Sequence, residues 1–416
     1  MTITINNKNK KTNVPNLRFK EFQGEWEKCT FDKIAQYKKG PFGSALKKDI
    51  FVPQSKDTIK VYEQQNAIKK DWTLSRYYIT KGYFNSHMKQ FVAKAGDLIV
   101  SCAGTIGEIY ELPQDAEEGV FNQALMRVQV NDEAVNKEIF ITVFSSMIDK
   151  FSKIYSNGSA IKNIPPFADL KKTQVFLPCK EEQKKIAKLL VLLDERIATQ
   201  NKIIDKLQTL IKGLNDSLYE LYGNGITTSF AELGHSYPGL SGKTANDFGT
   251  GKPFITYLNV YSNNIVNEND YQYVRINEGE KQNVAKYGDV LFTLSSETPE
   301  EVGVGSVFLG KDEVYLNSFC FGIHIENEEL VYSPYLSYYV SSTPFRKFIY
   351  PFAQGSTRFN LCKADFEKAS IKLPLLENQI HIYAILNSIA EKIETEEMML
   401  EKYLNQKQYL LRQMFI

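Results

Sequence analysis

Two stretches of this chain carry the same long apolar seam, and this repeated seam is the feature that most constrains the fold. In the first stretch, about residues 181–222, a polar residue, Gln200, interrupts the series once. The other members follow one another at alternating steps of four and three: Ile186, Leu190, Leu193, Ile197, Ile204, Leu207, Ile211, Leu214, Leu218 and Leu221. This spacing is typical of a helix that packs along its whole length against another helix. About 40 residues at 1.5 Å each form a helix of roughly 60 Å.

The seam recurs about 196 residues later, in a second predicted helix over about 377–415. Its members on the same positions are Ile382, Leu386, Ile389, Ile393, Leu400, Leu410 and Met414. Glu396 stands where the first helix has Gln200, and Tyr403 and Lys407 replace two seam residues. A single long helix on a domain surface would also be amphipathic, but a repeated seam favours a pair of helices.

The residues before each helix also repeat, which indicates a duplicated globular module. The clearest matching segments are 96–99 with 288–291, 121–123 with 316–318, and 168–178 with 364–374. Each module alternates short β-branched and aromatic runs with Gly, Asn and Pro, and contains short helical patterns over 137–155 and 333–348. We therefore predict α+β modules, each with a curved, mostly antiparallel sheet.

The order of module, helix, module and helix predicts an antiparallel helix pair. A parallel return would require the second module to span about 60 Å, more than the diameter of a 150-residue domain. The expected protein has two similar domains joined by an antiparallel two-helix coiled coil with pseudo-twofold symmetry. Gln200 and Glu396 then approach each other near the helix midpoints, where a polar layer would fix the register; an exposed position for both residues is the alternative. The predicted segments are a disordered tail (1–15), a first domain (16–178), a first helix (179–222), a second domain (223–374) and a second helix (375–416).

Composition is that of a soluble globular protein, with 43% hydrophobic residues, 24% charged residues and a net charge of +1. Near-neutral charge means that any surface for a polyanion must be local. The five cysteines form no C-x-x-C pair, which argues against a zinc site or a disulfide framework and favours a cytoplasmic location. No apolar run is long enough for a membrane span, and the polar N-terminus has no signal-peptide pattern.

Two segments are similar to catalytic motifs but lack their essential residues. The run 162–167 has the Pro-Pro turn of amino-methyltransferases, yet Ile164 occupies the position of the residue that holds the target amino group. The run 239–244 ends like a phosphate-binding loop, but Tyr237 replaces its first glycine. The four histidines share no spacing that suggests a metal site or a catalytic dyad. We predict neither a catalytic nor a metal site.

Binding to a polyanion is a better hypothesis, because basic residues outnumber acidic ones over residues 1–175. A loop that combines cations, glycines and an aromatic residue suits phosphate contact, and a nearby amide cluster suits base edges, although a solvated basic face remains the alternative. The predicted DNA-binding residues here are Lys38, Lys39, Phe42, Ser44, Lys47, Lys48, Gln64, Gln65, Asn66, Lys69 and Lys162. The slightly acidic second module has fewer candidates: Lys243, Lys252, Tyr257, Asn259 and Arg358.

The duplicated architecture resembles the specificity subunit of type I restriction–modification systems. The resemblance covers essentially the whole chain and includes the opening residues 14–19 and 24–27 and the run 239–243. It implies that each module is a target-recognition domain for one half of a bipartite DNA site, with the helices as a spacer. It also implies two adenine-N6 methyltransferase subunits docked on the helices, together with restriction subunits that supply endonuclease and translocase activity. The two connections into the helices differ, because Ile164-Pro165-Pro166 is replaced by Leu361-Cys362, one residue shorter.

We therefore predict a non-catalytic DNA-recognition subunit that binds double-stranded DNA. S-adenosylmethionine, ATP and Mg²⁺ are expected only in its partner subunits. The predicted partner-binding residues on the helices are Leu193, Gln200, Leu207, Ile389 and Glu396. The alternative is a duplicated coiled-coil scaffold that does not bind DNA; a stand-alone methyltransferase is disfavoured. The sequence does not predict the target bases or the gap between them.

Overall fold

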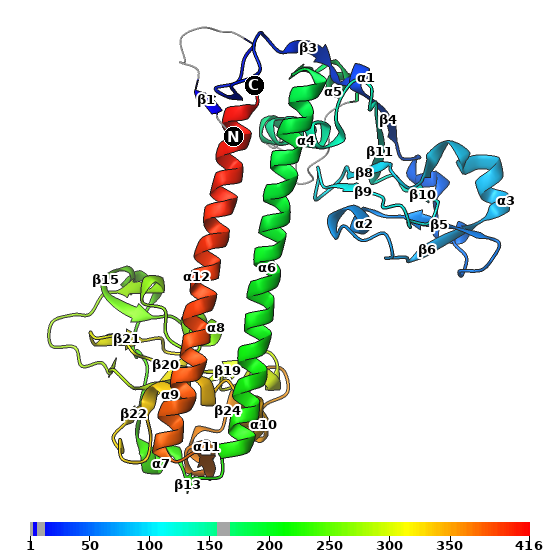
Figure 1. Cartoon of the computed structure of the whole chain (residues 1–416). Helices are drawn as coiled ribbons and strands as arrows, with labels where there is room; N and C mark the ends of the chain where they lie inside the picture. Colours follow the sequence, from blue (N-terminus) through cyan, green and yellow to red (C-terminus); the bar gives the residue numbers. More distant parts are fainter. Residues whose placement is uncertain (1–2, 6–12, 156–166) are drawn as a thin grey trace. The chain divides into compact units, whose positions relative to one another are not determined.

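The computed structural model describes residues 3–5, 13–155 and 167–416, which form two compact units (Figure 1). The first unit comprises Met1–Ala198 with Glu401–Ile416, and the second comprises Thr199–Leu400. Each unit contains one module and a part of each long helix, α6 (Lys180–Tyr222) and α12 (Leu376–Met414). The unit borders thus fall inside the helices, unlike the predicted segment borders, because each helix packs on both modules in turn.

The first module (16–178) is built on two four-stranded sheets, ordered β6-β5-β10-β7 and β4-β11-β8-β9. Its strands are β2 (Leu17–Phe19), β3 (Glu27–Thr30), β4 (Ala35–Lys39), β5 (Thr58–Tyr62), β6 (Tyr77–Thr80), β7 (Val92–Ala93), β8 (Leu98–Ser101), β9 (Ile109–Glu111), β10 (Gly119–Phe121), β11 (Leu125–Val130) and β12 (Gln174–Leu177). Its helices are α1 (Phe31–Ile34), α2 (Gln64–Ile68), α3 (Lys81–Tyr83), α4 (Lys137–Tyr155) and α5 (Phe167–Lys172).

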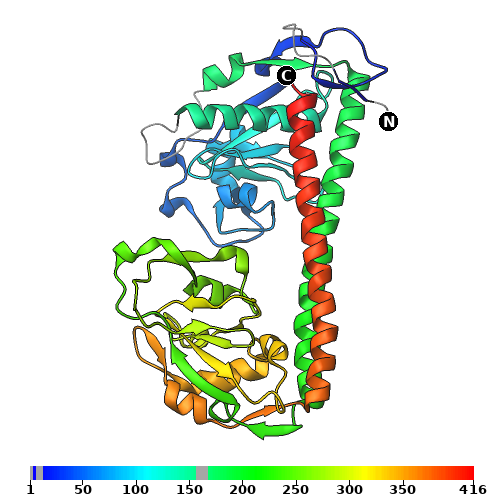
Figure 2. The same cartoon turned by 90° about the vertical axis from the view of Figure 1, so that its left-hand side faces the viewer.

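The second module (223–374) repeats this topology, with sheets β16-β15-β21-β17 and β14-β22-β18-β20 (Figure 2). Its strands are β13 (Ile226–Thr228), β14 (Gly234–Pro238), β15 (Phe248–Ile255), β16 (Gln272–Val274), β17 (Val284–Ala285), β18 (Val290–Thr293), β19 (Ser295–Ser296), β20 (Gly305–Val307), β21 (Val314–Leu316), β22 (Cys320–Ile325), β23 (Ala353–Gln354), β24 (Phe359–Leu361) and β25 (Ile371–Leu373). Its helices are α7 (Phe230–Leu233), α8 (Tyr257–Ser262), α9 (Ser333–Tyr339), α10 (Thr343–Ile349) and α11 (Lys363–Lys368).

The prediction of α+β modules is confirmed, but the single curved sheet is wrong. In each module the chain leaves one sheet at a tight turn and enters the other. The turn at Asn122 joins β10 to β11, and the turn at Asn317 joins β21 to β22; Leu125 N donates to Asn122 O (3.1 Å) and Cys320 N to Asn317 O (3.0 Å). One ladder is parallel in each module, β5 with β10 and β15 with β21. The rest of the described ladder pairings inside these four-stranded sheets are antiparallel.

Aromatic side chains fill the core beneath the sheets. In the first module, Phe31, Phe140 and Phe144 are fully buried around α4, whose bounds match the predicted helix at 137–155. In the second, the predicted helix at 333–348 is split into α9 and α10. Ser342 caps α10, since its hydroxyl accepts from Phe345 N (3.3 Å), and Pro344 cannot donate the backbone bond that would continue α9.

The two long helices pack against each other in antiparallel orientation, as predicted. In the first unit Leu190 and Leu193 of α6 share a core with Leu410 of α12. In the second unit Leu386 of α12 shares a core with Leu214 of α6. Residues that are late in α6 thus pack with residues that are early in α12, and the reverse holds in the other unit.

A repeated glutamine joins each module to its long helix. Gln183 Nε2 donates to Pro178 O (2.9 Å), and its Oε1 accepts from Asn136 N (2.7 Å). Gln379 makes the same pair of bonds, to Pro374 O (2.8 Å) and from Tyr332 N (2.9 Å). Both side chains are buried, so the duplication extends to the joint between domain and helix.

Of the predicted disordered tail at 1–15, the structure describes only residues 3–5 and 13–15. Strand β1 (Ile3–Ile5) pairs with β2, and Trp26 N donates to Asn13 O (2.7 Å). Arg18, in β2, forms a buried ion pair with Glu182 of α6 (2.7 Å). In the part of the chain that the structure describes, no helix has the length and apolar content that a membrane crossing requires.

Candidate nucleic-acid interface

A glycine opens an equivalent surface loop in each module. Gly40 N donates to Leu125 O (3.0 Å) after β4, and Gly239 N donates to Cys320 O (3.2 Å) after β14. A Cβ on Gly40 would lie 1.9 Å from Asn122 O, and one on Gly239 would lie 2.0 Å from Asn317 O. Only glycine allows this approach, so both loops are held against the turns that connect the two sheets.

In the first module this loop presents an aromatic ring among cations. Phe42 is 88% exposed, and its flanking residues Ser44, Lys47 and Lys48 are also exposed. Lys39 at the end of β4 is exposed as well, whereas Lys38 is half-buried and donates to Gln90 Oε1 (2.8 Å). An exposed ring beside unshielded ammonium groups suits contact with a nucleic acid.

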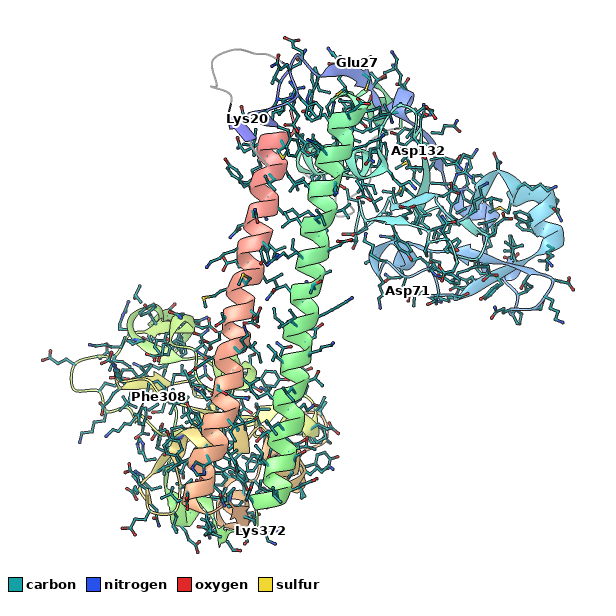
Figure 3. All side chains as sticks on the ribbon, viewed as in Figure 1. Lys20, Glu27, Asp71, Asp132, Phe308 and Lys372 are labelled. Atoms are coloured by element: carbon teal, nitrogen blue, oxygen red, sulfur yellow. The ribbon has the colours of Figure 1, made fainter. Side chains whose placement is uncertain are left out.

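The predicted amide cluster on α2 is divided by the fold. Gln64 Nε2 donates to the backbone oxygens of Ala103 and Thr105, so both N–H groups of its amide are used within the module. Asn66 is 1% exposed and its Nδ2 donates to Asp71 O (2.9 Å), in the loop after α2 where Figure 3 labels Asp71. Burial therefore contradicts base contact by Asn66, whereas Gln64 is half-buried with both amide N–H groups in use, and Gln65 and Lys69 are exposed.

Two predicted contacts of the second module are also contradicted. Asn259 is 0% exposed; its Nδ2 donates to Asn267 O and its Oδ1 accepts from Asn267 N, both at 2.9 Å. The Lys243 side chain is 6% exposed and forms an ion pair with Glu280 (2.5 Å). The hydrogen bond from Lys243 is the main cause that lowers the pKa of Glu280 to about 2. Both residues hold loops in place.

The remaining candidates have different outcomes. Lys252 lies exposed on β15, at a register shift in its pairing with β16. Tyr257 and Arg358 are brought to the same end of the module: the Tyr257 hydroxyl donates to Ser295 O (2.8 Å) on β19, which pairs with the strand that follows Arg358. Lys162 and the Pro-Pro turn lie outside the described residues.

The helix residues predicted to bind partners lie mainly inside the helix pair. Gln200 and Glu396 approach as predicted: Gln200 Nε2 donates to Glu396 O (3.1 Å) and to its carboxylate. Both are buried, as is Leu193, so these three are unavailable to a partner, contrary to the prediction. Leu207 and Ile389 are half-buried.

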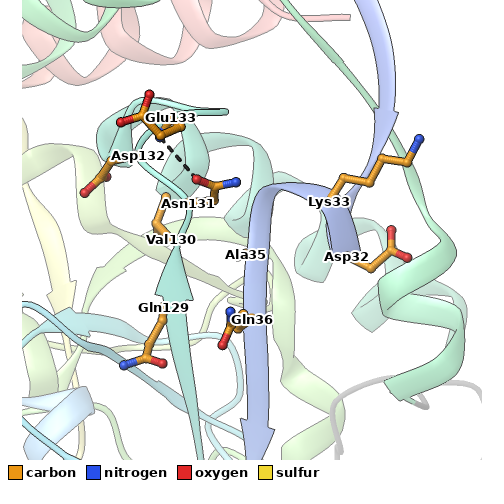
Figure 4. Close-up of a pocket in the computed structure, with 9 residues that line it drawn as sticks. All are labelled: Asp32, Lys33, Ala35, Gln36, Gln129, Val130, Asn131, Asp132 and Glu133. Carbon is orange, nitrogen blue, oxygen red and sulfur yellow. Dashed lines mark hydrogen bonds between the residues drawn. The ribbon is translucent and has the colours of Figure 1, made fainter.

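A hollow of about 470 Å³ lies at the ends of β4 and β11 in the first module (Figure 4). Asp32, Asp132 and Glu133 line it together with a single cation, Lys33. Glu133 N donates to Asn131 Oδ1 (3.2 Å) on its rim. Carboxylates repel phosphates, so this hollow is unsuited to DNA, and the loop after β4 is the better candidate interface.

A family model for the type I restriction modification DNA specificity domain matches residues 23–209 and again residues 241–406. The chain belongs to this family. Its two matches coincide with the two modules and their helices. As a specificity subunit, the chain is a non-catalytic component whose function is DNA sequence recognition.

Solved structures support the fold of this specificity subunit. The type I restriction–modification S subunit from M. genitalium is 16% identical, with a TM-score of 0.53, over 97% of this chain and 99% of that chain. A structure from a study of assembly and conformational transition of the type I system is 16% identical, with a TM-score of 0.59, over 93% and 96% of the two chains.

Sequence reasoning missed two exposed apolar residues of the second module. Leu258 is 67% exposed beside Tyr257, and Phe319 is 55% exposed after the Asn317 turn. The Arg358 guanidinium lies 5.8 Å from the Phe319 ring centroid. The matching of residues 121–123 with 316–318 pointed to this turn, but nothing in the pattern distinguished an exposed phenylalanine from a core one.

Replacing Lys48 by alanine is expected to weaken binding to all DNA sequences alike. If Lys48 neutralises one phosphate, the slope of log K against log salt concentration falls by about one. The same is expected for Lys39→Ala. Salt titrations of the assembled complex would measure it, with Lys28→Ala on β3 as the control, because Lys28 is exposed outside this loop. A loss restricted to one target sequence contradicts the phosphate role.

Gln65→Ala is expected to relax recognition at one base position. An amide that binds a base edge contributes about 1–3 kcal/mol of discrimination. Methylome sequencing would show one position of the first half-site becoming degenerate. Lys69→Ala, four residues further along the same segment, is the matched control and should leave the base preference unchanged. A uniform loss of binding from Gln65→Ala would make this residue a positioning group instead.

Proposed function

We propose that each module recognises one half of a bipartite target in double-stranded DNA and that the two helices set the gap between the halves. Two methyltransferase subunits would dock on the helices, and restriction subunits would join this assembly. S-adenosylmethionine, ATP and Mg²⁺ would be bound by those partners. The observation that carries the proposal is the duplication: both modules hold an equivalent glycine-opened loop against an equivalent asparagine turn.

The spacer role rests on the continuity of the helices. α6 runs without interruption for 43 residues, roughly 65 Å at 1.5 Å per residue, and passes from the first unit into the second. A paired helix of this length is stiff, because every seam contact resists bending. A stiff connection would permit one gap length and exclude others.

The docking role rests on an exposed apolar edge of the helix pair in the second unit. Ile203 and Leu210 on α6 each come one residue before a seam residue, and so do Ile385 and Met399 on α12. In an antiparallel pair, the positions just before the seam on both helices lie along the same edge. These four side chains are 38%, 52%, 46% and 39% exposed, so they form an apolar strip along that edge.

The opposite edge of the same helices is already covered by the second module. Asn215, one residue after a seam position of α6, donates from Nδ2 to Tyr338 O (2.8 Å). Tyr383, one residue after a seam position of α12, packs its ring against Tyr332 and Tyr338, with centroids 5.5 and 5.9 Å apart. The apolar strip therefore faces away from the module, where an amphipathic helix of a partner would bury it.

Leu210→Glu is expected to abolish assembly with the methyltransferase subunit while leaving the fold intact. A carboxylate in a buried helix interface loses its hydration without a partner, which costs several kcal/mol. Size-exclusion chromatography and a thermal melt would separate lost assembly from lost folding. Leu375→Glu is the matched control, because Leu375 is 54% exposed in the same unit but precedes α12. Retained assembly in Leu210→Glu would refute this docking edge.

Methylation activity is expected only from the assembled complex. The isolated chain should transfer no methyl groups, and activity should appear when the methyltransferase subunit is added. We place the complex in the cytoplasm, which is supported by five free cysteines.

A further inference from the structure

Three exposed side chains lie on neighbouring segments at one end of the second module: Leu258, Phe319 and Arg358. Leu258 is 67% exposed and Phe319 55% exposed, and the Arg358 guanidinium lies 5.8 Å from the Phe319 ring centroid. Single exposed apolar side chains are common on protein surfaces, but two that large, with a cation held on one of them, form a combined apolar and positive surface.

The segment Leu294–Ser295 forms hydrogen bonds that position the backbone near all three side chains. Leu294 N donates to Phe319 O (2.9 Å), and Leu361 N donates to Leu294 O (2.8 Å), which fixes the strand that follows Arg358. The adjacent Ser295 O accepts the Tyr257 hydroxyl, which fixes the residue before Leu258. The backbone around these side chains is therefore rigid, although the side chains themselves are solvent-exposed.

The first module contains the same frame with different side chains on it. Cys102 N donates to Ala124 O (2.8 Å), as Leu294 N does to Phe319 O. Gln64 Nε2 donates to Ala103 O, as the Tyr257 hydroxyl does to Ser295 O. Ala124 is thus the counterpart of Phe319.

The two modules also differ at one exposed helix position, which is Gln65 on α2 and Leu258 on α8. Asn66 and Asn259 are buried counterparts on α2 and α8, so the residues before them, Gln65 and Leu258, occupy the same exposed position. Two modules that bind different half-sites need a constant frame with exchangeable exposed residues, and this position meets both requirements.

The chemistry of these residues indicates which base feature they contact. Among the groups that bases present in the major groove, the 5-methyl of thymine is the apolar one, and leucine and phenylalanine have no polar atoms for the other edges. Arg358 beside them supplies a positive charge that complements the DNA backbone. We infer that Leu258 and Phe319 contact thymine methyl groups in the half-site bound by the second module. This inference rests on the proposed function.

The test replaces thymine by uracil, which removes only the methyl group. After methylome sequencing defines both half-sites, synthetic duplexes with uracil in the second module's half-site are titrated against the complex of the chain with its methyltransferase subunits. Wild type is expected to lose about fourfold in affinity for each buried methyl group, from the transfer free energy of one such group. In Leu258→Ala and Phe319→Ala, replacing the contacted thymine by uracil should leave the affinity nearly unchanged.

Three controls make the outcome specific. Tyr287→Ala removes another exposed aromatic ring (62% exposed) of the same module and should keep the wild-type response. Uracil in the other half-site should affect wild type and Phe319→Ala equally. Phe319→Leu keeps an apolar contact and should retain part of the discrimination, which covers the case in which Phe319→Ala fails to fold.

A half-site without thymine, or a wild-type complex indifferent to uracil there, would overturn the inference. So would variants that discriminate uracil normally but lose the methyltransferase subunit, since the surface would then bind protein. Failure of the proposed function is a different result: the wild-type complex would then bind all DNA sequences equally.

Discussion

Arg18→Ala is expected to lower the free energy of unfolding of the first unit by about 3–5 kcal/mol, because it leaves a buried carboxylate without its partner. The Arg18 guanidinium binds both oxygens of Glu182, at 2.8 and 2.7 Å, and the Glu182 side chain is 0% exposed. Arg18 also donates to Gly24 O, so the N-terminal segment would lose its attachment to α6.

Tryptophan fluorescence during urea unfolding would measure this loss for the first unit alone, since both tryptophans of the chain, Trp26 and Trp72, lie there. Lys185→Ala is the control: the side chains of its ion pair with Glu21 are both 46% exposed, so a much smaller loss is expected. The double variant Arg18→Met, Glu182→Leu should recover most of the stability, because no charge stays buried. Equal effects of Arg18→Ala and Lys185→Ala would contradict this account.

Adding one heptad to both long helices is expected to change the gap in the target while leaving both half-sites unchanged. Seven residues in each helix preserve the seam, and they lengthen the pair by about 10.5 Å, equivalent to at most about three base pairs at 3.4 Å each. Methylome sequencing would read the new gap directly. The insertions belong beside Gln200 and Glu396, where the two helices are in register.

The linker at 223–228 is less suitable for such an insertion. Its residues Ile226–Thr228 pair with β25, and a Cβ on Gly225 would lie 2.4 Å from Leu375 N, so the linker is part of a rigid joint. Seven residues inserted at the exposed Lys311–Asp312 turn serve as the control and should change neither gap nor half-sites. Altered half-sites with an unchanged gap in the helix variant would show that the helices are not the spacer.

The sequence predicted the recurring architecture well, because its signals are local or periodic. The helix pair follows from a seam whose spacing any helix must obey, and an offset shared by Gln200 and Glu396 was enough to place them together. The resemblance of the whole chain to specificity subunits extended this prediction to function. The same reasoning missed the break between α9 and α10, although Ser342 and Pro344 are recognised helix-start signals.

The exposure of the candidate DNA-binding residues was predicted only in part, because residue type does not report burial. Lys39, Phe42 and Lys48 are exposed at the loop after β4, as their chemistry suggested. Lys243 and Asn259 have equally suitable chemistry, yet each satisfies a partner brought close by the fold. Phe319 shows the opposite case: it lies in an apolar run that suggests burial, yet its side chain is exposed.

The sequence alone therefore determined what repeats: two modules, two helices and their antiparallel pairing. These properties depend on the spacing of apolar residues and of repeated segments, and both can be read from the sequence. Only the tertiary structure decided which of the polar residues are free to contact DNA. That choice depends on backbone groups far away in sequence, such as Ser295 for Tyr257 and Ala103 for Gln64, which reach these side chains only when the two sheets of each module have formed.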